Sequence, residues 1–111
     1  MDRIELYRKI IKDLLEEYAQ YPPANGDIEV EAILDEVRDR YLLLGQGWEG
    51  HRRVHGCSVH LDIKDGKVWL QHDSTDAEIA RQLVERGIPQ QDIVLGFQPE
   101  RIRRLSGFGV G

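Results

Sequence analysis

The chain has 111 residues, of which 41% are hydrophobic and 32% charged. This length and composition predict one domain, residues 1–111, with a packed core rather than a disordered polar segment. The net charge of -5 disfavours nonspecific binding to duplex DNA, because such binding depends on clustered lysines and arginines that neutralise phosphates.

The placement of charge and cysteine narrows the class of protein further. Residues 1–44 carry 11 acidic and 6 basic groups, whereas residues 45–111 carry 9 of each, so the acidic excess lies in the first part. No apolar run approaches the roughly 20 residues of a membrane-spanning helix, and the first residues lack the apolar centre of a signal peptide. Cys57 is the single cysteine, which excludes a disulfide within one chain and fits a reducing compartment. We therefore expect a cytoplasmic protein with no membrane partner.

Residues 3–19 have the spacing of an amphipathic helix, with apolar positions at Ile4, Tyr7, Ile11, Leu14, Leu15 and Tyr18. Asp2 and Glu5 fit the two ends of a capping box at its start. Two prolines follow at once, so the segment from Tyr21 to Asp27 is predicted to be a loop.

Residues 28–34 and 41–44 are predicted to be two strands joined by a charged turn. The first alternates apolar and acidic residues, and the second is a short apolar run. A single helix from Asp27 to Leu44 is the alternative, because glutamate, alanine, leucine and arginine are good helix formers.

Asp65-Gly66 separates two alternating segments, Val54–Lys64 and Lys67–His72, and this pattern predicts a hairpin with a two-residue turn. The predicted cross-strand pairs are Lys64–Lys67, Ile63–Val68, Asp62–Trp69, Leu61–Leu70, His60–Gln71 and Val59–His72. In this register His72 lies on the apolar face of the hairpin, while His60 and Asp62 lie on the other face.

A second helix is predicted from Asp76 to Arg86, with a capping box at Thr75 and Glu78 and a left-handed exit at Gly87. The apolar segment from Asp92 to Phe97 has no firm assignment. The predicted fold is therefore α+β, with a mainly antiparallel sheet of about four strands, an N-terminal helix and a second helix after the sheet.

Three sequence patterns are candidate sites of chemistry. The GxGxxG match from Gly45 to Gly50 leads into a strand instead of a helix, so a strand-connecting turn is favoured over a nucleotide site. His60 and Asp62, with Ser58 as a further neighbour, are too few for a zinc site, which needs three or four ligands. Cys57 has His55 two residues away but no third group to orient it, and the favoured interpretation is a buried or half-buried cysteine in a sheet. We expect no cofactor, no resident metal and no catalytic residue.

Several segments taken together resemble the XisI family: Tyr7–Ile11, Gly26–Val30, Gly47-Trp48, Arg52–Cys57, His60–His72, Glu85–Pro89 and Asp92–Phe97. Members of this family are cyanobacterial proteins named as controlling factors for excision of the fdxN element. The resemblance implies an accessory factor in DNA excision, with a separate recombinase that performs strand exchange. It also implies a partner, XisH, whose fold resembles endonuclease-like proteins, and it supplies no catalytic residues.

The first hypothesis is a noncatalytic module that binds an XisH-like protein and contacts a recombinase–DNA complex only indirectly, with self-association left open. Its candidate interaction surface, including a solvent-facing Trp69, comprises His60, Asp62, Trp69, Arg101, Arg103 and Arg104. The alternative is a metal-assisted nuclease or hydrolase using His60 and Asp62, with Cys57 or His72 nearby. A third hypothesis is a DNA-binding regulator in which the three arginines contact phosphate.

Overall fold

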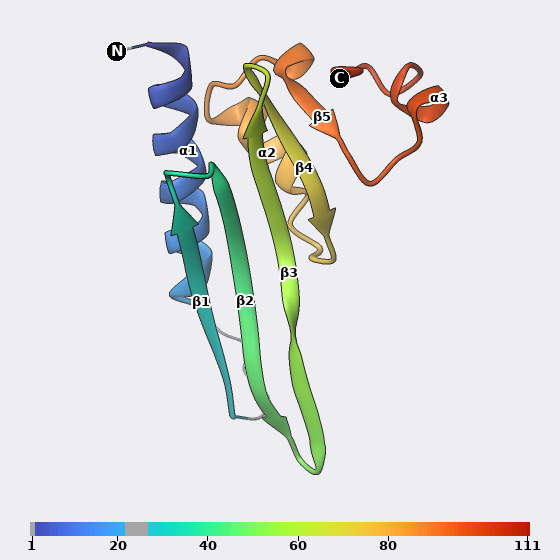
Figure 1. The fold of residues 1–111 in the computed structure, drawn as a ribbon. Coiled ribbons are helices and arrows are strands. Elements are labelled where there is room, and N and C mark those ends of the chain that lie inside the picture. The colour runs from blue at the N-terminus through green and yellow to red at the C-terminus, as the bar shows by residue number, and fades with distance from the viewer. Residues whose placement is uncertain (1, 22–26) are drawn as a thin grey trace.

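The computed structural model describes residues 2–21 and 27–111, so most of the loop predicted between Tyr21 and Asp27 lies outside the described residues. The elements are, in chain order, α1 (Arg3–Ala19), β1 (Asp27–Asp35), β2 (Arg40–Glu49), β3 (Arg52–Lys64), β4 (Lys67–Asp73), α2 (Ile79–Glu85), the 3₁₀ turn η1 (Gln90–Asp92), β5 (Ile93–Leu95) and α3 (Glu100–Arg103). The strands form one sheet in the order β1-β2-β3-β4-β5 (Figure 1).

The predicted α+β class is confirmed, and the sheet gains a fifth strand from the unassigned segment Asp92–Phe97. Strands β1 to β4 form an antiparallel meander, whereas β5 runs parallel to β4. A parallel neighbour requires a crossover, and α2 lies in that connection. The second helix therefore stands between two strands of the sheet and not after all of them.

Helix α1 forms as predicted. The Asp2 carboxylate accepts a hydrogen bond from the Glu5 amide at 2.9 Å, which caps the first turn. The buried stripe consists of Tyr7, Ile10, Ile11, Leu14 and Leu15. It packs on β1, β2 and β3, while the α2 residues Ile79 and Leu83 complete the same core. We call the sheet surface under these helices the helix face.

The segment from Asp27 to Leu44 is two strands, so the single-helix alternative is wrong. Strand β2 is longer than predicted and continues to Glu49. Gly45 and Gly47 therefore lie inside β2, and only Gly50 lies at the turn, where its φ is 65°. The prediction of a connecting turn is correct for the end of the GxGxxG match and wrong for its start.

The Asp65-Gly66 turn is confirmed, with φ of 55° at Asp65 and 76° at Gly66. The predicted register holds from Lys64–Lys67 to Leu61–Leu70 and then shifts by one residue, because Gln71 is an extra residue in β4. His60 consequently pairs with His72, and Val59 pairs with Asp73. The predicted pairs His60–Gln71 and Val59–His72 are wrong, and His72 is an exposed residue outside the apolar core.

Helix α2 begins three positions later than predicted, at Ile79. The Ile79 amide donates to Asp73 Oδ2 at 3.2 Å, and Glu78 has a left-handed φ of 51°, so the capping box predicted at Thr75 does not form. The exit at Gly87 is confirmed by its φ of 116°. The Ile88 amide donates to the Leu83 carbonyl at 3.0 Å, which closes the end of the helix.

Both ends of α1 are tied to the rest of the fold. The Tyr7 hydroxyl donates to the Asp92 carboxylate, and burial together with this bond raises the pKa of Tyr7 to about 12. At the other end, Arg86 Nη2 lies 2.8 Å from Glu17 Oε2, which joins α2 to α1. No helix in residues 2–21 and 27–111 is long and apolar enough to cross a membrane.

Candidate functional site

Asp62 is the only buried charged residue in the described part of the chain, with 6% exposure. Its Oδ1 lies 2.8 Å from His60 Nε2, and its Oδ2 accepts from Gln71 Nε2 at 3.2 Å. Arg40 Nη1 lies 3.2 Å from the same Oδ2. Oδ2 is therefore engaged by both neighbouring strands, β2 and β4, while Oδ1 is engaged by His60 within β3. The predicted pair His60–Asp62 is part of a cross-strand network.

The shifted register changes the neighbourhood of His60. His72 lies directly opposite His60. In the predicted register, which lacks the shift at Gln71, the two histidines lie on opposite faces of the hairpin. Within the described residues, no group of three or more His, Cys, Asp and Glu side chains is arranged to hold a metal ion. No sequence pattern indicates the register shift, because the extra residue Gln71 continues the alternation of apolar and polar residues in β4.

Trp69 is half-buried, and the prediction that its ring faces solvent is wrong. Lys64 Nζ lies 4.0 Å from the ring centroid, and Arg103 Cζ lies 5.5 Å from it. Arg103 also donates to the Val110 carbonyl at 2.8 Å and to the Gln98 carbonyl at 2.9 Å. Arg103 therefore holds the C-terminal segment over the indole.

The other two predicted arginines lie at the same end of the chain but are exposed. Arg104 Nη2 pairs with Glu100 Oε1 at 2.9 Å, within one turn. Arg101 is exposed on α3. The structure thus brings His60, Asp62 and Trp69 together on the face opposite the helices, with Arg103 above the indole.

Cys57 lies in β3 and is half-buried. Its thiol donates to the Val59 carbonyl at 3.0 Å. Burial raises the pKa of the Cys57 thiol, so the thiolate needed for nucleophilic attack is scarce at neutral pH. This agrees with the interpretation of Cys57 as a structural thiol.

The β2–β3 hairpin carries a hollow that was not predicted from the sequence. Figure 1 shows that this hairpin extends past the end of α1, so no helix of residues 2–21 and 27–111 covers its outer part, here called the arm (residues 45–56). The hollow has a volume of about 290 Å³. Its lining residues are Ile28, Val30, Gly45, Val54, His55, Gly56, Cys57, Ser58 and Ser74.

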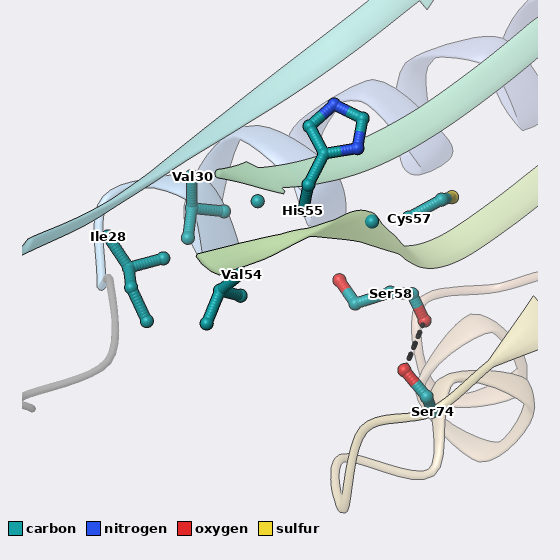
Figure 2. A pocket seen from close by; sticks show the side chains of 9 residues that line it. Ile28, Val30, Val54, His55, Cys57, Ser58 and Ser74 are labelled. Carbon is teal, nitrogen blue, oxygen red and sulfur yellow. Dashed lines mark hydrogen bonds between the residues drawn. The ribbon is translucent and has the colours of Figure 1, made fainter. Parts of the chain in front are cut away.

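Figure 2 shows the hollow between β1 and the segment that follows β4. Ser74 Oγ donates to the Ser58 carbonyl at 3.4 Å and closes one end. Gly45 pairs with Val30 on one side and with Gly56 on the other, so two backbone glycines form part of the floor. In the sequence, only the spacing of the glycines indicated this hollow. That spacing can be interpreted only when β2 is known to continue through Gly47.

The topology and helix placement agree with a known family. Residues 1–110 match the family described as XisI protein. The protein belongs to the XisI family. The predicted resemblance is confirmed over almost the whole chain.

Two solved structures resemble this XisI-family protein. A XisI-like protein from Anabaena variabilis ATCC 29413 is 43% identical, with a TM-score of 0.87 over 95% of this chain and 96% of that one. The fdxN element excision controlling factor XisI from the same organism is 35% identical, with a TM-score of 0.83 over 99% of this chain and 100% of that one. No curated protein matches the chain.

Proposed function

We propose that this XisI-family protein is a noncatalytic controlling factor in the excision of a DNA element and acts by binding a protein partner. The name of the similar fdxN factor supports the process. The expected partner is an XisH-like protein, and any contact with a recombinase–DNA complex is indirect. A cytoplasmic location fits a process that acts on DNA and a chain with one cysteine.

The observation that carries the proposal is the acidic free edge of the sheet. Among the described strands, β1 pairs only with β2, so its outer backbone groups are open to another strand. Its sequence contains four carboxylates and no lysine or arginine. Glu29 and Glu31 are exposed along this edge. Such an edge attracts a basic protein and repels a second copy of itself.

Co-purification with an XisH-like protein tests the proposal. We expect one complex in size-exclusion chromatography at micromolar concentration, with affinity that falls as salt is raised. Glu29→Lys should weaken the complex, whereas Glu16→Lys on the exposed surface of α1 changes net charge by the same amount and should leave it unchanged. Separate elution of the two unmodified proteins at low salt would contradict partner binding.

A metal-assisted nuclease or hydrolase is the second candidate, favoured by the pairing of His60 with His72 beside Asp62. In this candidate the two imidazoles are ligands and the carboxylate orients His60. Metal analysis after dialysis against zinc or manganese tests it, with His60→Ala and His72→Ala as paired variants. Stoichiometric metal that both variants lose supports the enzyme, and absence of metal from the unmodified protein removes it.

A further inference from the structure

One side of the sheet has no cover over β1, β2 and β3 in the described structure. Figure 1 shows α1 and α2 behind the sheet, and α1 packs on β1, β2 and β3 from there. On the other side, the C-terminal segment lies over Trp69 of β4, where Arg103 and Gly111 approach the indole. We call the remaining surface of β1–β3, opposite the helix face, the open face; its central residues are Ile33, Leu42, Leu44 and Cys57.

The centre of the open face is apolar. Ile33 pairs with Leu42 across β1 and β2, and Leu44 pairs with Cys57 across β2 and β3. Ile33 is 37% exposed, and the other three are half-buried. Ile33 lies roughly 20 Å along β1 from Asp27, the residue at which this part of the described chain begins.

Strand β2 has the sequence pattern of a strand that is covered on both faces. Tyr41 and Leu43 are buried on the helix face, and Leu42 and Leu44 point the other way. An antiparallel strand with one solvated face normally alternates apolar and polar residues, whereas a continuous apolar run is typical of a strand buried on both sides. The described structure covers only one side of this run, so we look for its cover in another chain.

Opposite charges flank the apolar centre. On the β1 side, Glu29 and Glu31 are exposed, and on the β3 side, Arg53 and His55 are exposed. Strand alternation places all four on the open face, because each has the parity of the central apolar residues in its own strand. The open face is therefore acidic along β1 and carries a guanidinium and an imidazole along β3.

This pattern is complementary to itself. A two-fold axis parallel to β2, between two facing sheets, places β2 of one copy on β2 of the other and β1 of each copy on β3 of the other. Glu29 and His55 lie in one cross-strand row, because both pair with Gln46. The axis therefore brings Glu29 of each copy opposite His55 of the other, with Arg53 in the next row and Leu44 against Leu44 at the centre.

Other occupants fit this surface less well. A two-fold axis perpendicular to the strands places β1 on β1, so that Glu29 and Glu31 meet their own copies. Edge-to-edge pairing of two β1 strands meets the same repulsion. A partner with charge of a single sign matches one flank of the open face and opposes the other.

We propose that this protein forms a symmetric dimer in which the open faces of two copies pack together, with β2 on β2 and β1 on β3. The two apolar pairs form the centre of the interface, and Glu29 with Arg53 and His55 forms each flank. The outer edge of β1 stays available to another protein, because its backbone groups point sideways in the plane of the sheet. The inference goes beyond the proposed function and does not depend on it, since it involves only this chain.

Sedimentation of the purified full chain, with no other protein present, tests the inference. We expect a dimer at micromolar concentration. Leu44→Lys brings two ammonium groups together at the axis and should raise the dimer Kd about tenfold or more. Ile33→Lys changes a more exposed position and gives the same test if Leu44→Lys does not fold. Val37→Lys is the matched control and should leave Kd unchanged, because Val37 is 91% exposed in the turn between β1 and β2.

An exchange of charges tests the predicted orientation. Arg53→Glu places a carboxylate near Glu29 of the other copy and should raise Kd several-fold, and Glu29→Arg should do the same by placing two cationic groups together. The double variant restores opposite charges, so its Kd should return toward that of the unmodified protein. Lys9→Glu on the exposed surface of α1 changes net charge as Arg53→Glu does and should leave Kd unchanged.

Several results would overturn the dimer. An unmodified protein that sediments as a monomer throughout the micromolar range contradicts it, as does a dimer that persists in folded Leu44→Lys and Ile33→Lys variants. A double charge variant that associates more weakly than both single variants contradicts the orientation. If the unmodified chain is a monomer and Ile33→Lys abolishes binding of an XisH-like protein, the open face belongs to a different protein and the inference is wrong. Circular dichroism checks the fold of every variant, and co-purification with an XisH-like protein tests the proposed function separately.

Discussion

Two glycines two positions apart in β2 should respond in opposite ways to the same methyl group. At Gly47 the added Cβ would lie 1.8 Å from the Asp27 carbonyl oxygen and 2.7 Å from Ile28 Cα, and both of these are backbone atoms. At Gly45 the nearest atoms lie at 3.9 Å or beyond, which is ordinary van der Waals contact. The pair therefore separates steric exclusion from the general effect of replacing glycine in a strand.

The sizes of the two effects follow from these distances. Gly47→Ala requires the start of β1 to move by more than 1 Å, and we assign it the ~2–3 kcal/mol typical of severe overpacking. Its φ of 153° adds backbone strain. Gly45→Ala removes backbone freedom from the unfolded chain without strain, so it should stabilise the fold by about 0.5–1 kcal/mol. The two variants should differ by about 3 kcal/mol in the free energy of unfolding.

Urea unfolding followed by far-ultraviolet circular dichroism measures this difference, because the midpoint and slope give the free energy of unfolding. We expect the Gly45→Ala midpoint to rise slightly and the Gly47→Ala midpoint to fall well below that of the unmodified protein. A Gly47→Ala variant as stable as the unmodified protein would refute the close approach of β1 to β2. A large loss in Gly45→Ala would refute the argument that its glycine is dispensable to the fold.

Further outcomes follow from individual contacts. Asp62→Ala should lower the free energy of unfolding by about 1–3 kcal/mol, since it removes a buried acceptor from its donors, and an unchanged urea midpoint would argue against the network. The hydrogen bond from Arg8 holds the pKa of Asp39 below its usual range, so its stabilisation is present above about pH 4 and is lost as acid protonates the carboxylate. Asp39→Asn should therefore reduce the loss of stability measured by acid titration as the pH falls below about 4. Because the pKa of Cys57 is raised, iodoacetamide should alkylate it more slowly in the folded protein than in urea at pH 8, and equal rates would contradict the burial.

The features predicted correctly are those that short stretches of sequence determine. The α1 stripe and the Asp65-Gly66 turn depend on residues within a few positions of each other, and the family resemblance uses such segments in order. The start of α2 was misplaced because Asp73, a residue of β4, supplies the cap that Thr75 was expected to supply.

The features that the sequence could not give depend on contacts between strands. The extra residue Gln71 is recognisable only once β3 and β4 are paired, and it reverses the predicted separation of His60 and His72. Trp69 looked solvent-facing because its cover comes from Arg103 and the C-terminal segment, far along the chain. The hollow required the full length of β2 and the knowledge that α1 ends before it.

The Tyr7–Asp92 contact has a consequence for synthesis on the ribosome. The two residues are 85 positions apart, whereas β1 to β4 pair each with its neighbour in sequence. The meander can therefore assemble while the chain is still emerging, but the start of α1 lacks its tether until η1 has left the exit tunnel. We expect the amino-terminal helix to complete its docking among the last steps of folding, although it is the first element made.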